Sequence, residues 1–87
     1  MFVMVGENKW KVTWKHYTKE EDMENGFKIC ECNIYCDGVG DYHGMAFCHP
    51  NDNYMKETGS KIALTQALYP FTREQQTLFW TAYFNRK

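Results

Sequence analysis

The segment WKVTWKH, from Trp10 to His16, alternates large apolar and polar side chains without a break. Successive side chains of a β-strand point to opposite faces of a sheet, so a period of two predicts a half-buried strand. The apolar members are Trp10, Val12 and Trp14, and the polar members are Lys11, Thr13 and Lys15. A sheet containing this strand therefore has one face that needs a cover and one that does not.

A β-hairpin is expected to follow. Phe27–Cys36 and Tyr42–Cys48 are rich in strand-forming residues, and Asp37–Asp41 between them contains two glycines. Glycine adopts turn conformations that other residues avoid, so these five residues are predicted to form the turn. In that register Cys36 lies opposite Tyr42, and Cys30 lies opposite Cys48.

Alternation divides this hairpin into two faces. One face is small and mostly apolar, so a helix can approach it closely; it holds Cys30, Cys32, Ile34, Cys36, Tyr42, Gly44, Ala46 and Cys48. The other face mixes rings with polar groups and holds Ile29, Glu31, Asn33, Tyr35, His43, Met45 and Phe47.

The rest of the N-terminal half adds one more segment of regular structure. Phe2–Val5 is apolar and is either a short strand or an N-terminal extension, whereas Thr18–Gly26 is charged and is predicted to be a solvated loop or an open hairpin connection. The sheet is thus antiparallel with three strands, or four if Phe2–Val5 joins it. With 87 residues the chain fits one α+β domain, residues 1–87.

The first of two C-terminal helices is predicted from Asp52, its N-cap, to about Leu68. Pro50 ends the sheet before it because proline cannot donate to a strand ladder. The spacing assigns one helix face to the sheet, with Met55, Gly59, Ile62 and Ala63. Close packing against the sheet is the simplest reason for a glycine inside this helix.

The second helix is expected to begin after Pro70, with Thr72-Arg-Glu-Gln75 as a capping box, and to run to about Asn85. Its apolar stripe contains Phe79, Ala82 and Tyr83, which are expected to cover Leu64 and Leu68 of the first helix. One helix is therefore placed on the sheet and the other on the first helix.

The cysteines are the first candidates for chemistry. Cys30, Cys32, Cys36 and Cys48, with His43 and His49, contain the residue types of a zinc site. Structural zinc sites favour two C-x2–4-C knuckles, and Cys30-x-Cys32 is too tight for one. Buried packing explains the cysteines most simply, while a zinc, redox or Cys30–Cys48 disulfide role stays open. We expect no metal and no cofactor.

Other catalytic patterns are weak. Cys48 and His49 are adjacent, so on a strand they point to opposite faces, and a pair of Cys48 with His16 has no support in the sequence. Acidic residues at positions 20–24 lie in the predicted loop, and Gly38-x-Gly40 lacks the strand-to-helix setting of a phosphate loop. The chain is expected not to be an enzyme.

Charge and hydropathy further narrow the classes of function that the sequence allows. The net charge is −1 and basic residues form no block, which disfavours binding through a nucleic-acid backbone. The apolar segment at the N-terminus is too short for a signal peptide or a membrane span. A cytoplasmic protein with reduced thiols and no membrane partner is expected.

A mixed sheet face is the best candidate for function. Its binding residues are predicted to be Lys11, Lys15, Tyr17, Tyr35, His43, Met45 and Phe47, beside Thr13. Exposed rings on a sheet suit a protein partner and also the stacking of unpaired bases. Alternatively, helices or the N-terminal segment bury this face.

The chain also resembles small accessory proteins of tailed bacteriophages. The resemblance rests on Gly44-Met-Ala-Phe-Cys-His-Pro-Asn-Asp52 and on Gly59-Ser-Lys-Ile-Ala-Leu-Thr-Gln-Ala-Leu68. It also includes the opening Trp-x-Val strand and the aromatic last helix, and covers about two thirds of the chain. Gln66 departs from the pattern, which often has Arg there, so a role of that Arg in holding a partner is in doubt.

The resemblance implies a phage protein that binds and inhibits a host bacterial protein in the host cytoplasm, such as a CRISPR or restriction component. It supplies no catalytic residues. The alternative is a small nucleic-acid-binding factor of phage DNA or RNA metabolism, carried by Lys11, Lys15 and the rings. An unpaired sheet edge also allows a homodimer.

Overall fold

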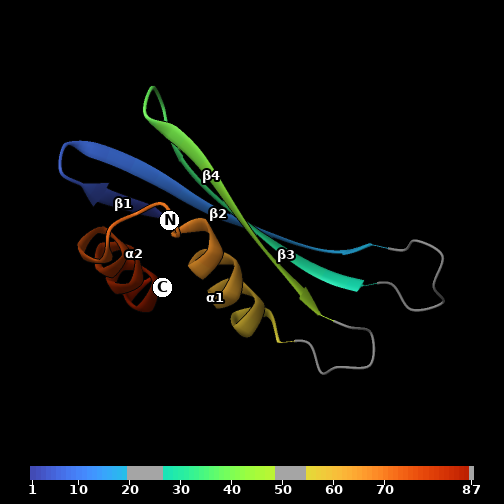
Figure 1. Ribbon diagram of the computed structural model, residues 1–87. Helices are drawn as coiled ribbons and strands as arrows, with labels where there is room; N and C mark the ends of the chain where they lie inside the picture. The colour runs from blue at the N-terminus through green and yellow to red at the C-terminus, as the bar shows by residue number, and fades with distance from the viewer. Residues whose placement is uncertain (20–26, 49–54, 87) are drawn as a thin grey trace.

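A computed structural model describes residues 1–19, 27–48 and 55–86 as a four-stranded antiparallel sheet followed by two helices (Figure 1). The elements are β1 (Phe2–Val5), β2 (Asn8–Lys19), β3 (Phe27–Cys36), β4 (Gly40–Cys48), α1 (Lys56–Ala67) and α2 (Arg73–Asn85). The predicted α+β class is confirmed, and the N-terminal segment is a strand rather than an extension.

The strands lie in the order β1-β2-β3-β4, each antiparallel to the next. The strand predicted over residues 10–16 is longer than expected, because Thr18 and Lys19 still pair with Lys28 and Phe27. The prediction that the charged loop begins at Thr18 is therefore wrong for these two residues, and its remainder lies outside the described residues.

The turn between β3 and β4 is shorter than predicted. Cys36 pairs with Gly40 and Cys30 pairs with Ala46, so three residues form the turn instead of five. Gly38 supplies the left-handed backbone conformation, with φ of 75°, that lets the chain reverse within this length. Both predicted pairs are wrong by two residues, but a shift of two keeps each side chain on its predicted face.

Both helices lie on the same side of the sheet (Figure 1). α1 contacts β3 and β4, while α2 contacts β1. The prediction that only one helix packs on the sheet is therefore wrong. The reason is that β1 widens the sheet beyond β2, which gives α2 a strand to cover beside α1.

The sheet-facing side of α1 differs in part from the prediction. Gly59 and Ala63 are buried as expected, but Met55 and Ile62 are 63% and 46% exposed. The buried positions of α1 are Gly59, Ser60, Ala63, Leu64 and Ala67. Met55 precedes the helix and makes no side-chain cap, and the predicted cap at Asp52 lies outside the described residues.

The closest approach of helix and sheet occurs at Gly44 of β4. A Cβ atom at this position would lie 1.9 Å from the carbonyl oxygen of Ala63 and 2.6 Å from the backbone nitrogen of Ala67. Backbone therefore meets backbone, and only glycine fits. The predicted close packing of helix against sheet is present, and the backbone contact lies at Gly44 of β4.

α2 begins as predicted. The Thr72 hydroxyl accepts a hydrogen bond from the Gln75 backbone N–H at 3.2 Å, and the Gln75 side chain accepts from the Thr72 N–H at 3.0 Å. Phe79 and Tyr83 are fully buried in one cluster with Leu64 and Leu68 of the α1 region, so the predicted apolar partners share the core.

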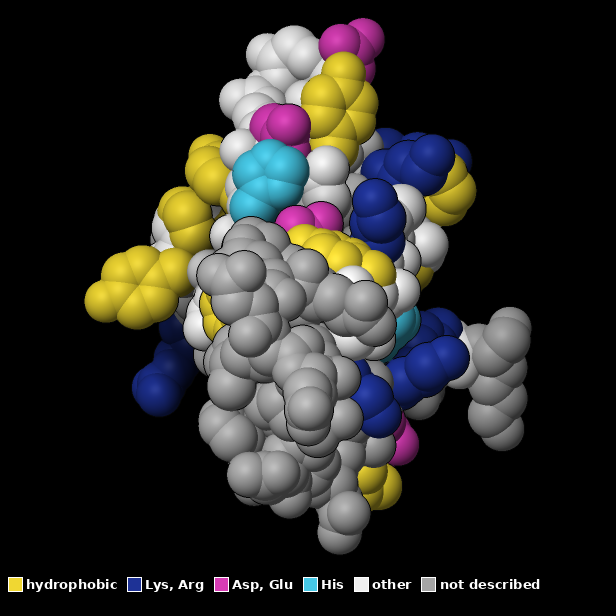
Figure 2. Space-filling model, turned by 90° about the vertical axis from the view of Figure 1, so that its right-hand side faces the viewer, with side chains coloured by type: hydrophobic (Ala, Val, Ile, Leu, Met, Phe, Trp, Pro, Cys, Tyr) yellow, Lys and Arg dark blue, Asp and Glu magenta, His cyan; other side chains and the backbone are white. Residues whose placement is uncertain are grey.

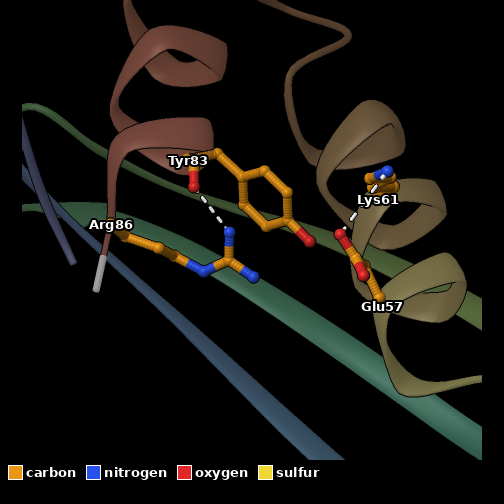
Figure 3. A network of polar contacts seen from close by, with 4 residues as sticks. All are labelled: Glu57, Lys61, Tyr83 and Arg86. Carbon is orange, nitrogen blue, oxygen red and sulfur yellow. Dashed lines mark hydrogen bonds and ion pairs between the residues drawn. The ribbon is translucent and has the colours of Figure 1, made fainter.

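Tyr83 lies between the helices and the sheet. Figure 3 shows its ring reaching from α2 toward the side of α1 where Glu57 and Lys61 form an i,i+4 ion pair, with a 3.6 Å separation of Nζ from Oε1. The Arg86 guanidinium lies over the ring, 3.6 Å from its centroid. The Tyr83 hydroxyl is buried and has no hydrogen-bond partner among the described residues.

Candidate functional site

Three cysteines with described side chains lie on the helix-covered face. Cys30, Cys32 and Cys36 are buried free thiols, which confirms the packing interpretation for them. Burial raises the pKa of Cys32 to about 12, and it also raises the pKa of Cys30 above its usual value. Thiols with raised pKa values stay protonated at neutral pH and are poor nucleophiles.

A polar cluster on this face was not predicted. His16 pairs directly with Cys30, and its Nε2 lies 3.8 Å from Cys30 Sγ and 3.4 Å from Ser60 Oγ of α1. Cys30 Sγ and Ser60 Oγ are 3.9 Å apart. The cluster joins helix to sheet, and the raised thiol pKa gives Cys30 no activation as a nucleophile.

The ligand set considered for zinc does not come together. His43 lies on the sheet face opposite to Cys30 and Cys32, because its position in β4 has the other parity. Among residues 1–19, 27–48 and 55–86, no three side chains of metal-binding type converge. The Cys48 side chain and His49 lie outside the described part, so the proposed Cys30–Cys48 disulfide is addressed only by register, which pairs Cys30 with Ala46.

The other side of the sheet carries every predicted binding residue. We call it the open face; its members are Phe2, Met4, Lys9, Lys11, Thr13, Lys15, Tyr17, Ile29, Glu31, Asn33, Tyr35, Asp41, His43, Met45 and Phe47. Both helices cover the opposite side, and β1 extends the sheet instead of crossing this face. The alternative that helices or the N-terminal segment bury it is therefore wrong.

The register aligns these side chains in rows across the strands. The first row contains Phe2, Lys11, Tyr35 and Asp41, and the second contains Thr13, Asn33 and His43. The third contains Lys15, Glu31 and Met45, and the fourth contains Tyr17, Ile29 and Phe47. The seven predicted residues therefore share one surface.

Four large apolar side chains are exposed on the open face. Phe2 is 57% exposed, Met4 55%, Tyr35 45% and Phe47 66%. Ile29, which lies between Tyr17 and Phe47 in the fourth row, is buried. Figure 2 shows yellow hydrophobic side chains beside dark blue Lys and Arg side chains at the right of the view. Exposed apolar groups beside charges are typical of a contact surface.

Phe2 and Met4 were not predicted as binding residues. They join the open face because β1 pairs with β2, which places Phe2 opposite Lys11 and Met4 opposite Lys9. Lys9 Nζ lies 4.5 Å from the centroid of the Phe2 ring. All four residues of Phe2–Val5 are apolar, so the sequence holds no alternation that could have assigned Phe2 and Met4 to this face.

On the side of the open face that carries the lysines, charged side chains contact an aromatic ring. Tyr17 donates a hydrogen bond to Glu31 Oε1 at 2.7 Å, and this bond is the main cause that raises the Tyr17 pKa. Lys15 Nζ lies 5.5 Å from the centroid of the Tyr17 ring. These contacts bring Lys15 and Tyr17 of β2 together with Glu31 of β3.

The opposite side of the face is more acidic. Tyr35 donates to Asp37 Oδ1 at 3.1 Å, which raises the Tyr35 pKa, and His43 Nε2 lies 3.4 Å from Asp41 Oδ1. Charge therefore changes from mainly basic along β2 to mainly acidic at the β3–β4 turn. A partner of one charge sign throughout would not match both sides.

Two polar groups in the sheet need separate mention. Asn33 Oδ1, in the centre of the open face, is buried and has no hydrogen-bond partner among the described residues. The backbone N–H of Met45 donates to Gln66 Oε1 at 3.1 Å. Gln66 thus anchors α1 to β4.

No helix within the described residues is long and apolar enough to span a membrane. Comparisons with protein-family models, with curated proteins and with solved structures find no match to this chain. The function is therefore argued from the chemistry of the open face.

Proposed function

We propose that this chain is a non-enzymatic phage-type protein that binds and inhibits a host bacterial protein through its open face. The observation that carries the proposal is that Phe2, Tyr35 and Phe47 are exposed on a sheet face opposite to both helices. Burying exposed aromatic side chains is a major source of binding energy in protein interfaces. The phage resemblance supplies the host setting, with action in the host cytoplasm on a CRISPR or restriction component.

The mixed charge of the face supports a protein partner. Lys11 and Lys15 lie in the same rows as Asp41 and Glu31. A folded protein can present carboxylates to the lysines and bases or amides to the acids, and such complementarity gives specificity. Inhibition then follows from occupancy, because a bound domain blocks the surface that it covers.

The test is a plating assay in bacteria that carry an active CRISPR or restriction system. Expression of the chain is expected to restore plating of a phage that the system targets. Phe47→Glu is expected to abolish the effect, because it places a carboxylate on the aromatic surface. The purified chain should also form a stoichiometric complex with the inhibited component in size-exclusion chromatography.

Phe84→Glu is the matched control. Phe84 is 62% exposed, close to the 66% of Phe47, but it lies on α2. The control should inhibit like the original chain. Unchanged plating with the original chain in every defence-carrying strain contradicts the proposed function, and equal loss in both variants contradicts the assignment to the open face.

Single-stranded nucleic acid is the second candidate. Lys9, Lys11 and Lys15 follow one another along β2 beside the rings of Phe2 and Tyr17, and rings beside bases suit stacked nucleotides. Glu31 and Asp41 in the same rows oppose phosphate, so this reading ranks second. Anisotropy titration of a labelled oligonucleotide at low salt tests it; no binding at micromolar protein removes it.

A further inference from the structure

Opposite charges are direct neighbours in the middle of the open face. Lys15 of β2 pairs with Glu31 of β3 in the third row. Lys15 is exposed and makes no ion pair with the residues that the structure describes. Glu31 accepts the Tyr17 hydroxyl through Oε1, while its Oε2 has no hydrogen-bond partner among the same residues. Both charges can therefore bind a group that approaches from outside the sheet.

A two-fold rotation about an axis along the strands, between β2 and β3, makes this pattern complementary to itself. The rotation places β2 of one copy over β3 of the other, and each row stays over the same row. Lys15 of each copy then lies over Glu31 of the other, so four charges of alternating sign form a square. Stacked sheets lie about 10 Å apart, a gap that a lysine and a glutamate side chain bridge together.

The first row matches itself under the same rotation. Lys11 pairs with Tyr35 across β2 and β3, so Lys11 of each copy comes over the Tyr35 ring of the other. Tyr35 is 45% exposed, and an ammonium group over an aromatic ring is attracted to it. Each of these two lysines therefore meets an acid or a ring of the second copy.

The direction of the axis decides whether the charges match. An axis across the strands would place β2 over β2 of the other copy and would bring both sets of lysines to one strip of the interface. Like charges opposed in an interface cost affinity. Of the two directions, the axis along the strands is the one that pairs bases with acids.

The open face offers enough area for a weak dimer. Each row advances by two residues, or about 7 Å, and neighbouring strands lie about 4.8 Å apart, so four rows over three strands cover roughly 400 Å² per copy. With the contribution of β1, two copies would bury about 800–1,000 Å² in total, which is the size of weak and transient interfaces. A dissociation constant on the order of 100 µM is therefore expected.

We propose that the open face also binds a second copy of this chain, in a two-fold dimer held by contacts between Lys15 and Glu31. The dimer and a complex with a host protein exclude each other, because both use the open face. The dimer does not rest on the function proposed for that face, since the charge pattern that forms it is complementary to itself.

The experiment is sedimentation velocity of the whole chain at about 5 to 500 µM, a range that includes the expected dissociation constant. The average mass should rise with concentration toward twice the monomer mass. Lys15→Glu and Glu31→Lys each oppose like charges at two places in the dimer and should weaken association at least tenfold. The double variant Lys15→Glu with Glu31→Lys restores opposite charges and should regain the association of the original chain.

Lys56→Glu is the matched control. It makes the same charge reversal as Lys15→Glu at an exposed residue of α1, away from the open face, and should associate like the original chain. Circular dichroism checks the fold of each variant. Lys15 is exposed, so Lys15→Glu carries the test even where loss of the bond from Tyr17 unfolds Glu31→Lys.

Phe47 is expected to stay uncovered in this dimer. It lies on β4 in the fourth row, and the rotation brings β4 over β1 of the other copy. β1 pairs only with residues 8–11 and so ends at the first row. Phe47→Glu should therefore leave the dimer unchanged, although it is expected to abolish the inhibition proposed for the open face.

Four results overturn the dimer. One is an average mass that stays at the monomer value up to about 500 µM. Another is a double variant that associates no better than the single ones, and a third is an equal loss in Lys56→Glu. The fourth is association that neither single reversal weakens, which places the contact elsewhere, such as at a strand edge. A monomeric chain that restores plating keeps the proposed function, so the two failures are distinguishable.

Discussion

The two faces of one sheet differ in what their side chains do. On the helix-covered face, small residues such as Gly44, Ala46 and Cys32 let α1 approach until backbone meets backbone. On the open face, neighbouring positions of the same strands carry long charged and aromatic side chains, such as Lys15, with contacts made within the sheet. Parity alone therefore separates the side chains that pack under the helices from those on the opposite face of the sheet.

The helix-covered face should tolerate little change, and Gly44→Ala should have the largest effect. The new Cβ would meet the Ala63 carbonyl and the Ala67 nitrogen, so helix and strand must separate. We expect a loss of about 3 kcal/mol in the free energy of unfolding, measured by urea denaturation. His43→Ala, the adjacent open-face position, is the control and should change it by less than about 0.5 kcal/mol. Similar values for both would break the comparison between the faces.

The second largest effect on stability is expected from alkaline pH, through a buried thiol of the helix-covered face. Burial raises the Cys32 pKa from 9.0 to about 12, so the unfolded chain releases this proton first as pH rises. The free energy of unfolding should then fall by up to about 1.4 kcal/mol per pH unit between these values, and be unaffected by this group below pH 9.

Other groups titrate in the same range, so the measurement is the difference between the original chain and Cys32→Ala in urea denaturation from pH 8 to 11. Cys32→Ala should show the flatter decline. Thr13→Ala, an exposed substitution on the open face, should decline as the original chain does. Parallel curves for Cys32→Ala and the original chain would show that this thiol is not held neutral by the fold.

A smaller, stabilising effect is expected from a substitution at Tyr83, which lies between the helices and the sheet. Tyr83→Phe removes a buried hydroxyl that has no partner among the described residues, so it should stabilise the chain by about 1 kcal/mol in thermal or urea unfolding. Tyr42→Phe removes a hydroxyl that is not among the fully buried unpaired atoms and should be close to neutral. Destabilisation by Tyr83→Phe would mean that this hydroxyl is satisfied in solution.

A substitution on the open face should have the smallest effect on the free energy of unfolding. Phe47→Ser removes a side chain that is 66% exposed, so the free energy of unfolding should change by less than about 0.5 kcal/mol. Circular dichroism and urea denaturation measure this directly. A loss of 2 kcal/mol or more would place Phe47 in the core and end its use as a probe of binding.

The faces could be predicted from the sequence because a period of two depends only on local order. The turn at Gly38 is two residues shorter than predicted, yet the described hairpin side chains keep their faces, since a shift of two preserves parity. The capping box at Thr72 was equally predictable, as all its contacts lie within four residues.

What could not be predicted depends on long-range pairing. The contact of His16 with Cys30 and Ser60 requires both the β2–β3 register and the placement of α1. The addition of Phe2 to the open face requires knowledge that β1 pairs with β2. The rings of Trp10, Tyr42 and Phe71 come from segments far apart in sequence, and no local pattern encodes their contact.

The backbone contact at Gly44 has a consequence for how such a chain can diverge. Main-chain atoms set the distance between α1 and the sheet at Gly44. The side chains on the opposite face of the same strands therefore take no part in fixing this distance. Substitutions at the exposed positions among them can accumulate without repacking the core. A lineage of this protein can therefore acquire a new recognition surface by successive single substitutions while inheriting its fold intact.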